Sequence, residues 1–264
     1  MDKQLEIVDL SFGYQNHDIL HDISLTVPKN KISIILGANG CGKSTLLKNM
    51  CKVLKPTKGH IYLNMQDIYQ YPAKQLAQKI GLMPQSPQTP EGITVYDLVS
   101  RGRFPYRQLF HAMSKEDHQI IMEAMELMKI TPLAKCHVDE LSGGQRQRVW
   151  LALALAQDTD ILFLDEPTTF LDIQYQIEIL DLLCDLNKKK GTTIVMVLHD
   201  INLAARYGDY IFALSKGKLI RHGKPAEILN ASLIEDVYGL KCQIIEDPLS
   251  GSPLVLPIGR HGMK

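Results

Sequence analysis

Apolar runs separated by polar turns divide this chain into alternating predicted strands and helices. Residues 32–36, 160–167 and 192–198 are largely apolar runs with the length of buried strands. Residues 115–128 carry apolar side chains near helical spacing, and a further helix is predicted over residues 173–188. This alternation predicts an α/β core.

Two regions depart from this alternation. Residues 5–27 hold apolar residues around a turn at Asn16-His17-Asp18, which predicts an antiparallel β region. Residues 94–136 predict a mostly helical subdomain inserted in the core, whose methionines are expected to fill its interior, or alternatively to line a partner-binding groove. Within this helical subdomain, a helix is expected at residues 94–99, followed by an interruption at 101–107.

The remaining segments are expected to form short strands and a helix. Strands are expected at 59–63 and 80–84, and a hairpin at 210–214 and 218–223. Residues 225–264 are expected to form a helix followed by a short β-rich tail.

The segment Gly37-Ala38-Asn39-Gly40-Cys41-Gly42-Lys43-Ser44-Thr45 lies between an apolar strand and a helix-like run. Glycine permits the backbone conformations in which successive N–H groups close around phosphate oxygens, and a helix N-terminus adds partial positive charge. Lys43 is placed to reach the β- and γ-phosphates, Ser44 to bind a bridging Mg²⁺, and Thr45 to reach an α-phosphate. The alternative is a glycine-rich turn before an ordinary helix, which the order strand, loop, helix disfavours.

Two carboxylates end the predicted strand at residues 160–167. Asp165 is expected to hold Mg²⁺, directly or through water, and Glu166 to polarise the attacking water as a general base. Asp-Glu pairs are common on surfaces but rare at the end of a buried strand. The pair therefore indicates a hydrolytic site at the carboxyl edge of a parallel sheet.

Three single residues each have a functional and a plainer interpretation. Tyr14 could stack on an adenine, or only pack against its strand. Gln85 could offer its amide oxygen to Mg²⁺, or be an ordinary exposed loop residue. His199 could contact the γ-phosphate and hold the attacking water, or be structural. Taken singly, Gln85 and His199 favour the plainer interpretation, and Tyr14 is evenly divided between its two.

The motif Leu141-Ser142-Gly143-Gly144-Gln145 precedes an apolar, helix-like run. Ser142 can cap that helix, and the adjacent glycines leave its first N–H groups exposed as a second anion site without a lysine. One chain thus carries two half-sites for phosphate, which suits a protein whose copies complete each other's sites.

Composition narrows the function classes. The 29 Lys and Arg residues balance the 29 Asp and Glu residues and no dense basic stretch stands out, so no nucleic-acid partner is expected. The 5 cysteines are widely spaced without a CxxC pair, which argues against a disulfide framework or zinc site and fits a reducing compartment. The N-terminus does not have the pattern of a signal peptide, and no run approaches the roughly 18 apolar residues that span a bilayer. Any membrane role is expected to act through a partner, from the cytoplasmic side.

The chain resembles the ATP-binding-cassette (ABC) ATPases. This resemblance is carried by the combination of residues 37–45, residues 141–148 and Asp165-Glu166. The family's remaining motifs are matched in order by Tyr14, Gln85, Asp172 and His199. The resemblance implies a P-loop NTPase core with a mixed, mostly parallel sheet, an N-terminal antiparallel β subdomain and an inserted α-helical subdomain. Residues 1–264 would form a single ABC ATPase domain, with the α/β core and β subdomain at about 1–90 and 160–223, the helical subdomain at about 91–159, and a C-terminal helix and β tail at about 224–264.

A closer likeness covers nearly the whole chain. Segments 101–105, 145–150, 167–172 and 244–257 resemble the ATPase subunits of ferric-siderophore importers, with haem and cobalamin importers as near relatives. This likeness implies ATP hydrolysis that powers import of a ferric siderophore or related metal chelate, from the cytoplasmic face of the inner membrane. The implied cofactors are ATP and Mg²⁺. The implied partners are a second copy, two polytopic membrane permease subunits and, indirectly, a substrate-binding protein.

The resemblance further implies that two copies bind two ATP molecules between them. Closure of this dimer would push on the membrane subunits through the Gln85 loop and the helical subdomain. The catalytic residues would be Glu166, His199 and Gln85, and the Mg²⁺ ligands Ser44, Gln85 and Asp165. Nucleotide would be held by Tyr14, Gly37, Ala38, Asn39, Gly40, Cys41, Gly42, Lys43, Ser44 and Thr45, together with Ser142, Gly143, Gly144, Gln145 and Asp172 of the second copy.

Soluble ATP-dependent clamps or scaffolds, as in iron–sulfur assembly or DNA repair, share the cassette motifs. The DNA-repair class needs a long coiled-coil insertion, for which this chain has no room. The iron–sulfur class stays open, although it does not account for residues 101–107 or the C-terminal tail.

Cys41 stands at a position where the ATPases of siderophore importers commonly have serine. Its side chain should leave the backbone cradle unchanged, and ATP binding is expected to be sensitive to thiol modification.

Overall fold

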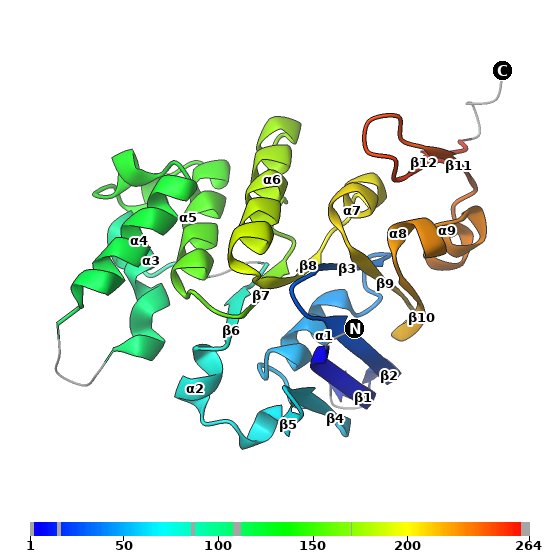
Figure 1. The fold of residues 1–264 in the computed structure, drawn as a ribbon, viewed down its shortest axis with the longest axis horizontal. Helices are drawn as coiled ribbons and strands as arrows, with labels where there is room; N and C mark the ends of the chain where they lie inside the picture. The colour runs from blue at the N-terminus through cyan, green and yellow to red at the C-terminus, as the bar shows by residue number, and fades with distance from the viewer. Residues whose placement is uncertain (1–2, 15–16, 86–87, 108–111, 170, 260–264) are drawn as a thin grey trace. The chain divides into compact units, whose positions relative to one another are not determined.

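The computed structural model describes residues 3–14, 17–85, 88–107, 112–169 and 171–259, which form two compact units (Figure 1). Unit 1 comprises Met1–Gln70 and Thr193–Lys264, and unit 2 comprises Tyr71–Thr192. The boundaries expected for the helical subdomain and the C-terminal tail stay a prediction.

The N-terminal part of unit 1 is an antiparallel sheet, as expected. Its strands run in the order β2-β1-β4-β5, with neighbours antiparallel. They are β1 (Lys3–Tyr14), β2 (His17–Pro28), β4 (Lys58–Leu63) and β5 (Gln66–Asp67). The prediction that His17 and Asp18 form the turn is wrong: they begin β2 and pair with Tyr14 and Gly13, because the ladder extends to the ends of both strands. Asn16 lies outside the described residues.

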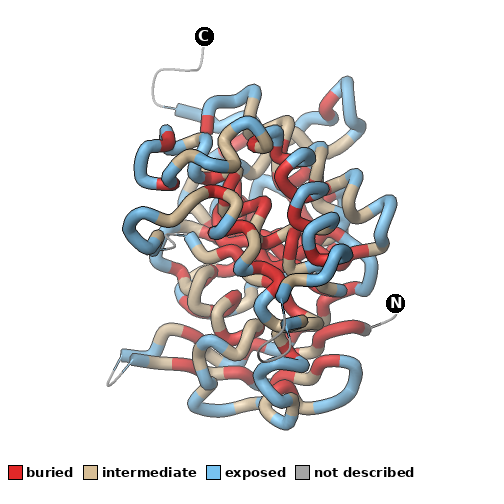
Figure 2. The backbone as a smooth tube through the Cα atoms, turned by 90° about the vertical axis from the view of Figure 1, so that its left-hand side faces the viewer, coloured by how far each residue is buried: buried red, intermediate tan, exposed pale blue. Residues whose placement is uncertain are grey.

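Unit 1 also contains a second group of hydrogen-bonded strands, of which β3 (Ile32–Gly37) is an inner member. This strand lies between β8 (Thr193–Val197) and β9 (Tyr210–Ser215) and is parallel to both, while β10 (Lys218–Gly223) forms the predicted hairpin with β9. Every residue of β3 and β8 is buried, and Figure 2 shows such buried positions gathered along the interior segments of the trace. Burial on both faces explains why these strands appear in the sequence as unbroken apolar runs.

Four helices of unit 1 accompany these strands: α1 (Lys43–Met50), α7 (Ile201–Tyr207), α8 (Pro225–Ile228) and α9 (Ala231–Tyr238). The single helix expected after residue 225 is instead the pair α8 and α9. The reason is local, since Asn230 has an extended backbone (φ −140°, ψ 169°) and its side chain accepts a hydrogen bond from the Leu233 N–H at 2.9 Å. Asn230 thereby ends one helix and caps the next.

The expected β-rich tail is the hairpin β11 (Cys242–Glu246) and β12 (Pro253–Pro257), which is fastened to α7. Val255 N–H donates to the Asn202 side chain at 2.8 Å, and Arg206 Nη2 donates to Asp247 Oδ2 at 2.7 Å. Hydrogen bonds from Ser250, Arg206 and the Leu249 N–H lower the pKa of Asp247 to about 2. The carboxylate therefore stays ionised, and the ion pair intact, well into the acid range.

Unit 2 combines two parallel strands with helices, so the expected α/β class with mostly parallel core strands is confirmed. The strands are β6 (Ile80–Met83) and β7 (Ile161–Asp165), which lie parallel to each other. The helices are α2 (Ala73–Ala77), α3 (Val95–Ser100), α4 (Lys115–Leu127), α5 (Gly143–Ala156) and α6 (Ile173–Lys190).

The predicted interruption in the helical region is a 3₁₀-helical segment at Arg101–Tyr106. Of the methionines expected to fill the core, Met125 and Met128 are buried, whereas Met122 is 41% exposed. Core filling therefore holds for the first two and not for Met122.

A buried ion pair fixes this 3₁₀ segment to α4. Arg103 Nε donates to Asp117 Oδ1 at 2.8 Å, and Arg103 Nη1 donates to the Ala156 carbonyl at 3.0 Å, so the guanidinium also reaches the end of α5. Burial alone would raise the pKa of Asp117, but hydrogen bonds from Arg103 and Ser114 outweigh it and lower the pKa. The charged form of Asp117 is the one that the fold stabilises.

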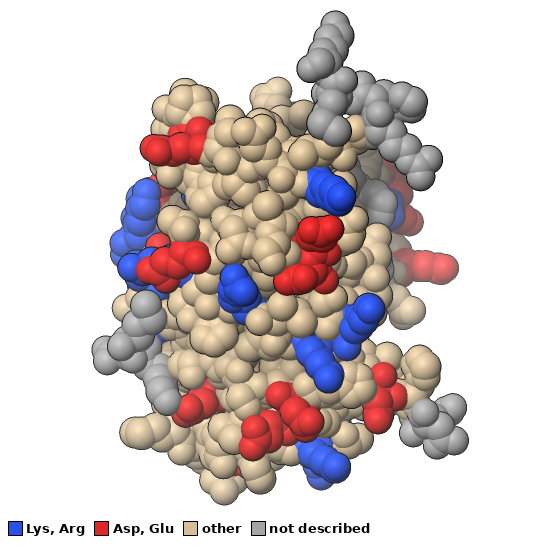
Figure 3. Space-filling view, turned by 90° about the vertical axis from the view of Figure 1, so that its right-hand side faces the viewer, with Lys and Arg blue, Asp and Glu red and all other residues tan. Residues whose placement is uncertain are grey.

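Charges of both signs are interspersed on the face that Figure 3 presents. Across the described ranges, no helix combines the length and apolar character needed to cross a membrane.

We predict that Asp117→Asn lowers the free energy of unfolding by about 3 kcal/mol or more, because it leaves a buried guanidinium without its counter-charge. Since the pKa of Asp117 is lowered on folding, its contribution is present above the ordinary carboxyl pKa of about 4 and is lost as pH falls through the folded value. Urea unfolding followed by circular dichroism at pH 7 and at lower pH would measure both effects.

A matched control is Lys31→Ala, which breaks the exposed Lys31–Asp209 pair and should change stability by less than about 1 kcal/mol. A wild-type-like unfolding midpoint for Asp117→Asn would contradict the prediction.

Candidate functional site

The loop between β3 and α1 has the backbone that a phosphate cradle requires. Gly42 has φ 103°, and a Cβ there would lie 2.7 Å from Leu20 Cδ2. Gly40 has φ 76°, while a Cβ there would meet no described atom within 4 Å. Gly42 is therefore required by packing as well as by φ, whereas Gly40 leaves the outer face of the loop open to an approaching group.

Lys43 folds back over this loop. Its Nζ donates to the carbonyls of Gly37 at 2.8 Å and Ala38 at 3.0 Å, and the residue is 5% exposed. Gly42, at the N-cap position of α1, has no side chain with which to cap the first helical N–H groups. A fixed ammonium and a helix N-terminus thus converge at one loop, and both favour an anion.

Cys41 points its thiol into the same loop. The residue is 6% exposed, and a Cβ built on Gly37 would lie 2.5 Å from Cys41 Sγ. Burial raises the pKa of the Cys41 thiol by more than nearby Lys43 lowers it. The thiol therefore fills space inside the loop and is held in its unreactive protonated form.

Unit 1 brings His199 to the same strand edge as this loop. Ile35 of β3 is paired with Val197 of β8 in parallel register, so Gly37 and His199, each two residues further on, both lie at the carboxyl edge. His199 is exposed, and Asp200 after it caps α7 by accepting from the N–H groups of Asn202 and Leu203 at 2.8 and 2.9 Å. The cap fixes the chain direction just beyond the histidine.

Tyr14 ends β1 with about half of its surface exposed. It is 48% exposed and makes a T-shaped contact with Phe12, with ring centroids 4.9 Å apart. Packing against the strand therefore leaves part of the Tyr14 side chain accessible to a ligand.

In unit 2, β7 ends in the two predicted carboxylates. Asp165 is 1% exposed, and Glu166, 8% exposed, has φ 55°, a left-handed conformation that costs a non-glycine residue about 1–3 kcal/mol. Thr169 Oγ1 donates to Glu166 Oε2 at 3.1 Å. The strand therefore turns sharply at Glu166, and Thr169 holds the carboxylate in a fixed orientation.

Gln85 follows the neighbouring strand. Met83 of β6 pairs with Leu164 of β7 in parallel register, so Gln85 and the two carboxylates leave the same edge of this strand pair. Gln85 is exposed. Its amide is thus available to a ligand at that edge, as the functional interpretation requires.

Helix α5 begins with the predicted serine cap and two glycines. Ser142 Oγ accepts from the Gln145 N–H at 3.3 Å while the Gln145 side chain accepts from the Ser142 N–H at 3.0 Å. A Cβ on Gly143 would meet no described atom within 4 Å, and one on Gly144 would lie 3.3 Å from Leu171. Neither glycine has positive φ, so neither is required by its backbone conformation, but a Cβ at residue 144 would require Leu171 to shift slightly. Around Gly143 no described atom of the chain covers the helix end.

Asp172 caps helix α6, its side chain accepting from the Tyr175 N–H at 3.0 Å. The residue is exposed, and the same carboxylate that caps the helix faces solvent. Within unit 2 the structure thus places Gln85, Ser142, Asp165, Glu166 and Asp172 at or just beyond the ends of strands or helices.

A family model described as "ABC transporter" matches residues 20–169, more than half of the chain. The chain belongs to the ABC transporter family. The cassette is 48% identical over 251 residues to the ferric enterobactin transport ATP-binding protein of Escherichia coli (strain K12), which covers 95% of this chain and 93% of that protein.

Two solved structures extend the comparison to the fold. A putative metal-chelate type ABC transporter in an inward-facing conformation gives a TM-score of 0.83 at 30% identity, covering 98% of the cassette and 99% of that chain. A dimeric ATP-binding cassette in a post-hydrolysis state, bound to ADP and Pi, gives 0.74 at 30% identity, covering 83% and 98%. The P-loop NTPase fold expected from the sequence is confirmed, and the cassette is the ATPase component of this transporter family.

Sequence reasoning gave no role to Gln147, which lies in the middle of the site of unit 2. It is 9% exposed, and its Nε2 donates to the carbonyl of Pro167 at 2.9 Å and, more weakly, to that of Glu166 at 3.5 Å. A signal was present, because Gln147 occupies the same face of α5 as the buried Leu151 and Ala154, at spacings of four and seven residues. A polar residue on an apolar helix face needs a buried partner.

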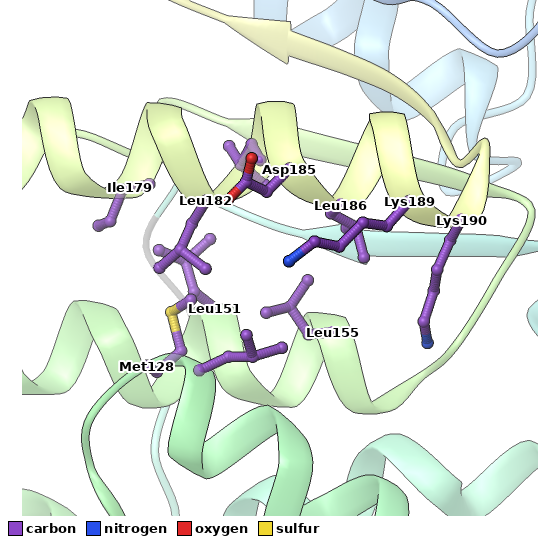
Figure 4. A pocket seen from close by; sticks show the side chains of 11 residues that line it. Met128, Leu151, Leu155, Ile179, Leu182, Asp185, Leu186, Lys189 and Lys190 are labelled. Carbon is purple, nitrogen blue, oxygen red and sulfur yellow. The ribbon is translucent and has the colours of Figure 1, made fainter.

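The cassette also holds an apolar pocket of about 130 Å³ within unit 2 (Figure 4). Leu151 and Leu155 of α5 face Leu182 and Leu186 of α6 across it, with Lys189 at its margin. Its walls offer few donors or acceptors, so it is unsuited to the phosphates and ribose of a nucleotide.

We predict that iodoacetamide labels Cys41 in the native cassette more slowly than the partly exposed Cys136, because burial raises the pKa of the Cys41 thiol, which lowers its thiolate fraction, and also limits access of the reagent. Peptide mass spectrometry over time at pH 7.5 would give both rates.

The control is Cys41→Ser, which should bind ATP as the unmodified cassette does. Equal labelling rates at the two cysteines would contradict the predicted difference in reactivity. Loss of ATP binding in Cys41→Ser would contradict the separate expectation that the side chain at this position leaves the backbone cradle unchanged.

Proposed function

We propose that this cassette hydrolyses ATP to power import of a ferric siderophore or a related metal chelate through a membrane ABC transporter. The observation that carries the hydrolytic part is the loop in which Lys43 is folded over an open, glycine-built cradle. The cargo is supported by the relative for ferric enterobactin, whose similarity extends over 95% of this chain.

The proposed roles follow from what each group can do where it lies. Lys43 exchanges two neutral carbonyl acceptors for phosphate oxygens, a change that strengthens its hydrogen bonds because the new acceptors are charged. Glu166 is the general base, held by Thr169 and by its strained backbone, and it takes the proton from the attacking water. His199 holds that water in line, and Tyr14 stacks on the adenine.

The oxygen donors proposed for the metal suit Mg²⁺. Ser44 offers a hydroxyl, Gln85 an amide oxygen and Asp165 a buried carboxylate, all of them hard ligands of the kind that Mg²⁺ prefers. When bound, Mg²⁺ would neutralise charge on the β- and γ-phosphates.

The site is proposed to be completed by a second copy. Neither Gly143 nor Gly144 is required by its φ, and a Cβ at Gly143 would meet no described atom within 4 Å. The end of α5, capped by Ser142, therefore suits close approach by an outside group. We assign that group to the γ-phosphate of an ATP bound on the loop of the other copy, with Gln145 and Asp172 beside it. The arrangement is isologous, so one dimer holds two ATP molecules.

The proposed assembly places this dimer on two polytopic permease subunits, at the cytoplasmic face of the membrane, with a substrate-binding protein delivering the chelate. ATP would close the dimer, and the Gln85 loop and the helices of unit 2 would transmit this movement to the permease subunits. Hydrolysis would then release the closed dimer.

We predict that Glu166→Gln lowers the ATPase kcat by about 10²–10⁴ through loss of the general base while MgATP still binds. Phosphate release and a nucleotide-binding titration would measure the two effects. Because ATP persists in this variant, size exclusion with ATP should show a dimer.

The exposed Glu126→Gln of α4 is a control in the same unit that should keep wild-type turnover. Near-normal kcat in Glu166→Gln would remove Glu166 from the role of base.

The cargo is tested by co-purifying the cassette with its candidate permease subunits in lipid and adding a binding protein with and without ferric siderophore. We expect ATPase stimulation that requires the loaded binding protein and disappears in Glu166→Gln. Stimulation by haem or cobalamin instead would reassign the cargo. Failure to associate with any permease would favour a soluble clamp, as in iron–sulfur assembly.

A further inference from the structure

The last helix of unit 1 reaches the phosphate loop with one side chain. Tyr238, at the C-terminal end of α9, accepts a hydrogen bond at its hydroxyl oxygen from the Gly37 N–H, with an N···O distance of 3.1 Å. The two residues are 201 positions apart in the sequence. The first amide of the phosphate loop is therefore held by a segment that carries none of the nucleotide-binding motifs.

Gly37 is closely surrounded by other parts of unit 1. A Cβ at Gly37 would lie 2.4 Å from the Leu214 carbonyl oxygen and 2.5 Å from Cys41 Sγ, so β9 and the loop itself already fill the space around its α-carbon. The carbonyl of the same residue accepts from Lys43 Nζ at 2.8 Å. Gly37 thus joins the Tyr238 hydroxyl on its amide side to the phosphate-binding lysine on its carbonyl side.

The tyrosine is itself firmly placed. Leu233, Ile234 and Val237 bury the apolar face of α9, and Gly239 ends the helix directly after Tyr238 in a left-handed conformation with φ 65°. The chain beyond continues into β11 and β12, which are fastened to α7 through Asn202 and Arg206. The hydroxyl therefore has little freedom to follow the loop if the loop moves, and the loop must adapt to the hydroxyl.

We propose that Tyr238 is a positioning residue of the nucleotide site: its hydroxyl sets the orientation of the Gly37 amide and so preorganises the loop of residues 37–45 for phosphate. Tyr238 does not contact the nucleotide in this proposal. Without its oxygen, the buried Gly37 amide has lost its acceptor, and the loop reaches its binding conformation less often. Because apparent affinity falls with the populated fraction of the competent state, ATP and ADP weaken together.

Tyr238→Phe tests this inference because it removes one oxygen and keeps the aromatic ring. The Kd for MgATP and for MgADP should each rise by about three- to tenfold, the range expected for one lost hydrogen bond. KM should rise with kcat unchanged, since the lost interaction serves ground state and transition state alike. Hydrogen exchange of the Gly37 amide should become faster.

The matched control is Tyr210→Phe. Tyr210 lies in the same unit, and its hydroxyl hydrogen-bonds His222 Nδ1 at 2.7 Å on the β9–β10 hairpin, with no part in the loop. It should keep wild-type Kd values and wild-type exchange at Gly37. A partly unfolded preparation of either variant would lower the apparent kcat but not change KM, so the comparison of KM remains decisive.

The inference rests on the proposed role of residues 37–45 in holding phosphate, and Lys43→Ala separates the two possible failures. If Lys43→Ala binds MgATP as the wild type does, the loop assignment fails and the role of Tyr238 fails with it. If Lys43→Ala loses binding while Tyr238→Phe keeps wild-type Kd and KM, the loop assignment stands and the role of Tyr238 is overturned. Neither result depends on which chelate is transported.

Discussion

The convergence of backbone N–H groups at the junction of β3 and α1 is the constraint on which the rest of the site depends. Such convergence requires positive φ at Gly40 and Gly42, and it leaves the first amides of a helix without side-chain caps. The remaining contacts around the loop serve to keep that conformation when no anion is present. Lys43 fills the cradle with its own ammonium, Cys41 packs its interior, and Tyr238 holds its first amide.

The backbone just after β7 is conformationally strained. Glu166 occupies a left-handed conformation that its side chain disfavours, and the surrounding hydrogen bonds must compensate. Gln147 supplies part of that compensation by donating to the carbonyls at and after the turn, and Thr169 holds the carboxylate itself. Gln147 comes from α5, so the helix that begins with the Ser142 motif also supports the turn that carries Glu166, the proposed general base.

The two kinds of glycine in the cassette show how different demands select the same residue. Gly42 is required by the fold, because both its φ and the neighbouring Leu20 exclude a side chain. Gly143 and Gly144 have ordinary φ, and a Cβ at Gly143 would meet no described atom within 4 Å, whereas one at Gly144 would lie 3.3 Å from Leu171. The first kind shapes the loop from within the chain, and the second, under the proposed function, leaves a helix end open to a partner.

Local sequence patterns were enough to predict the α/β class of the fold, the glycine-rich loop of residues 37–45, the carboxylate pair and the cap of α5, because each depends on residues close together in the chain. Tertiary structure decided what local patterns do not contain. The pairing of Tyr238 with Gly37 and the support of Glu166 by Gln147 join distant segments, and the split of the C-terminal helix follows from the extended backbone at Asn230. The prediction of a turn at His17-Asp18 was wrong for the same reason. These two residues pair with Tyr14 and Gly13 of the neighbouring strand. Cross-strand contacts decide where such pairing ends more than turn-forming residues do.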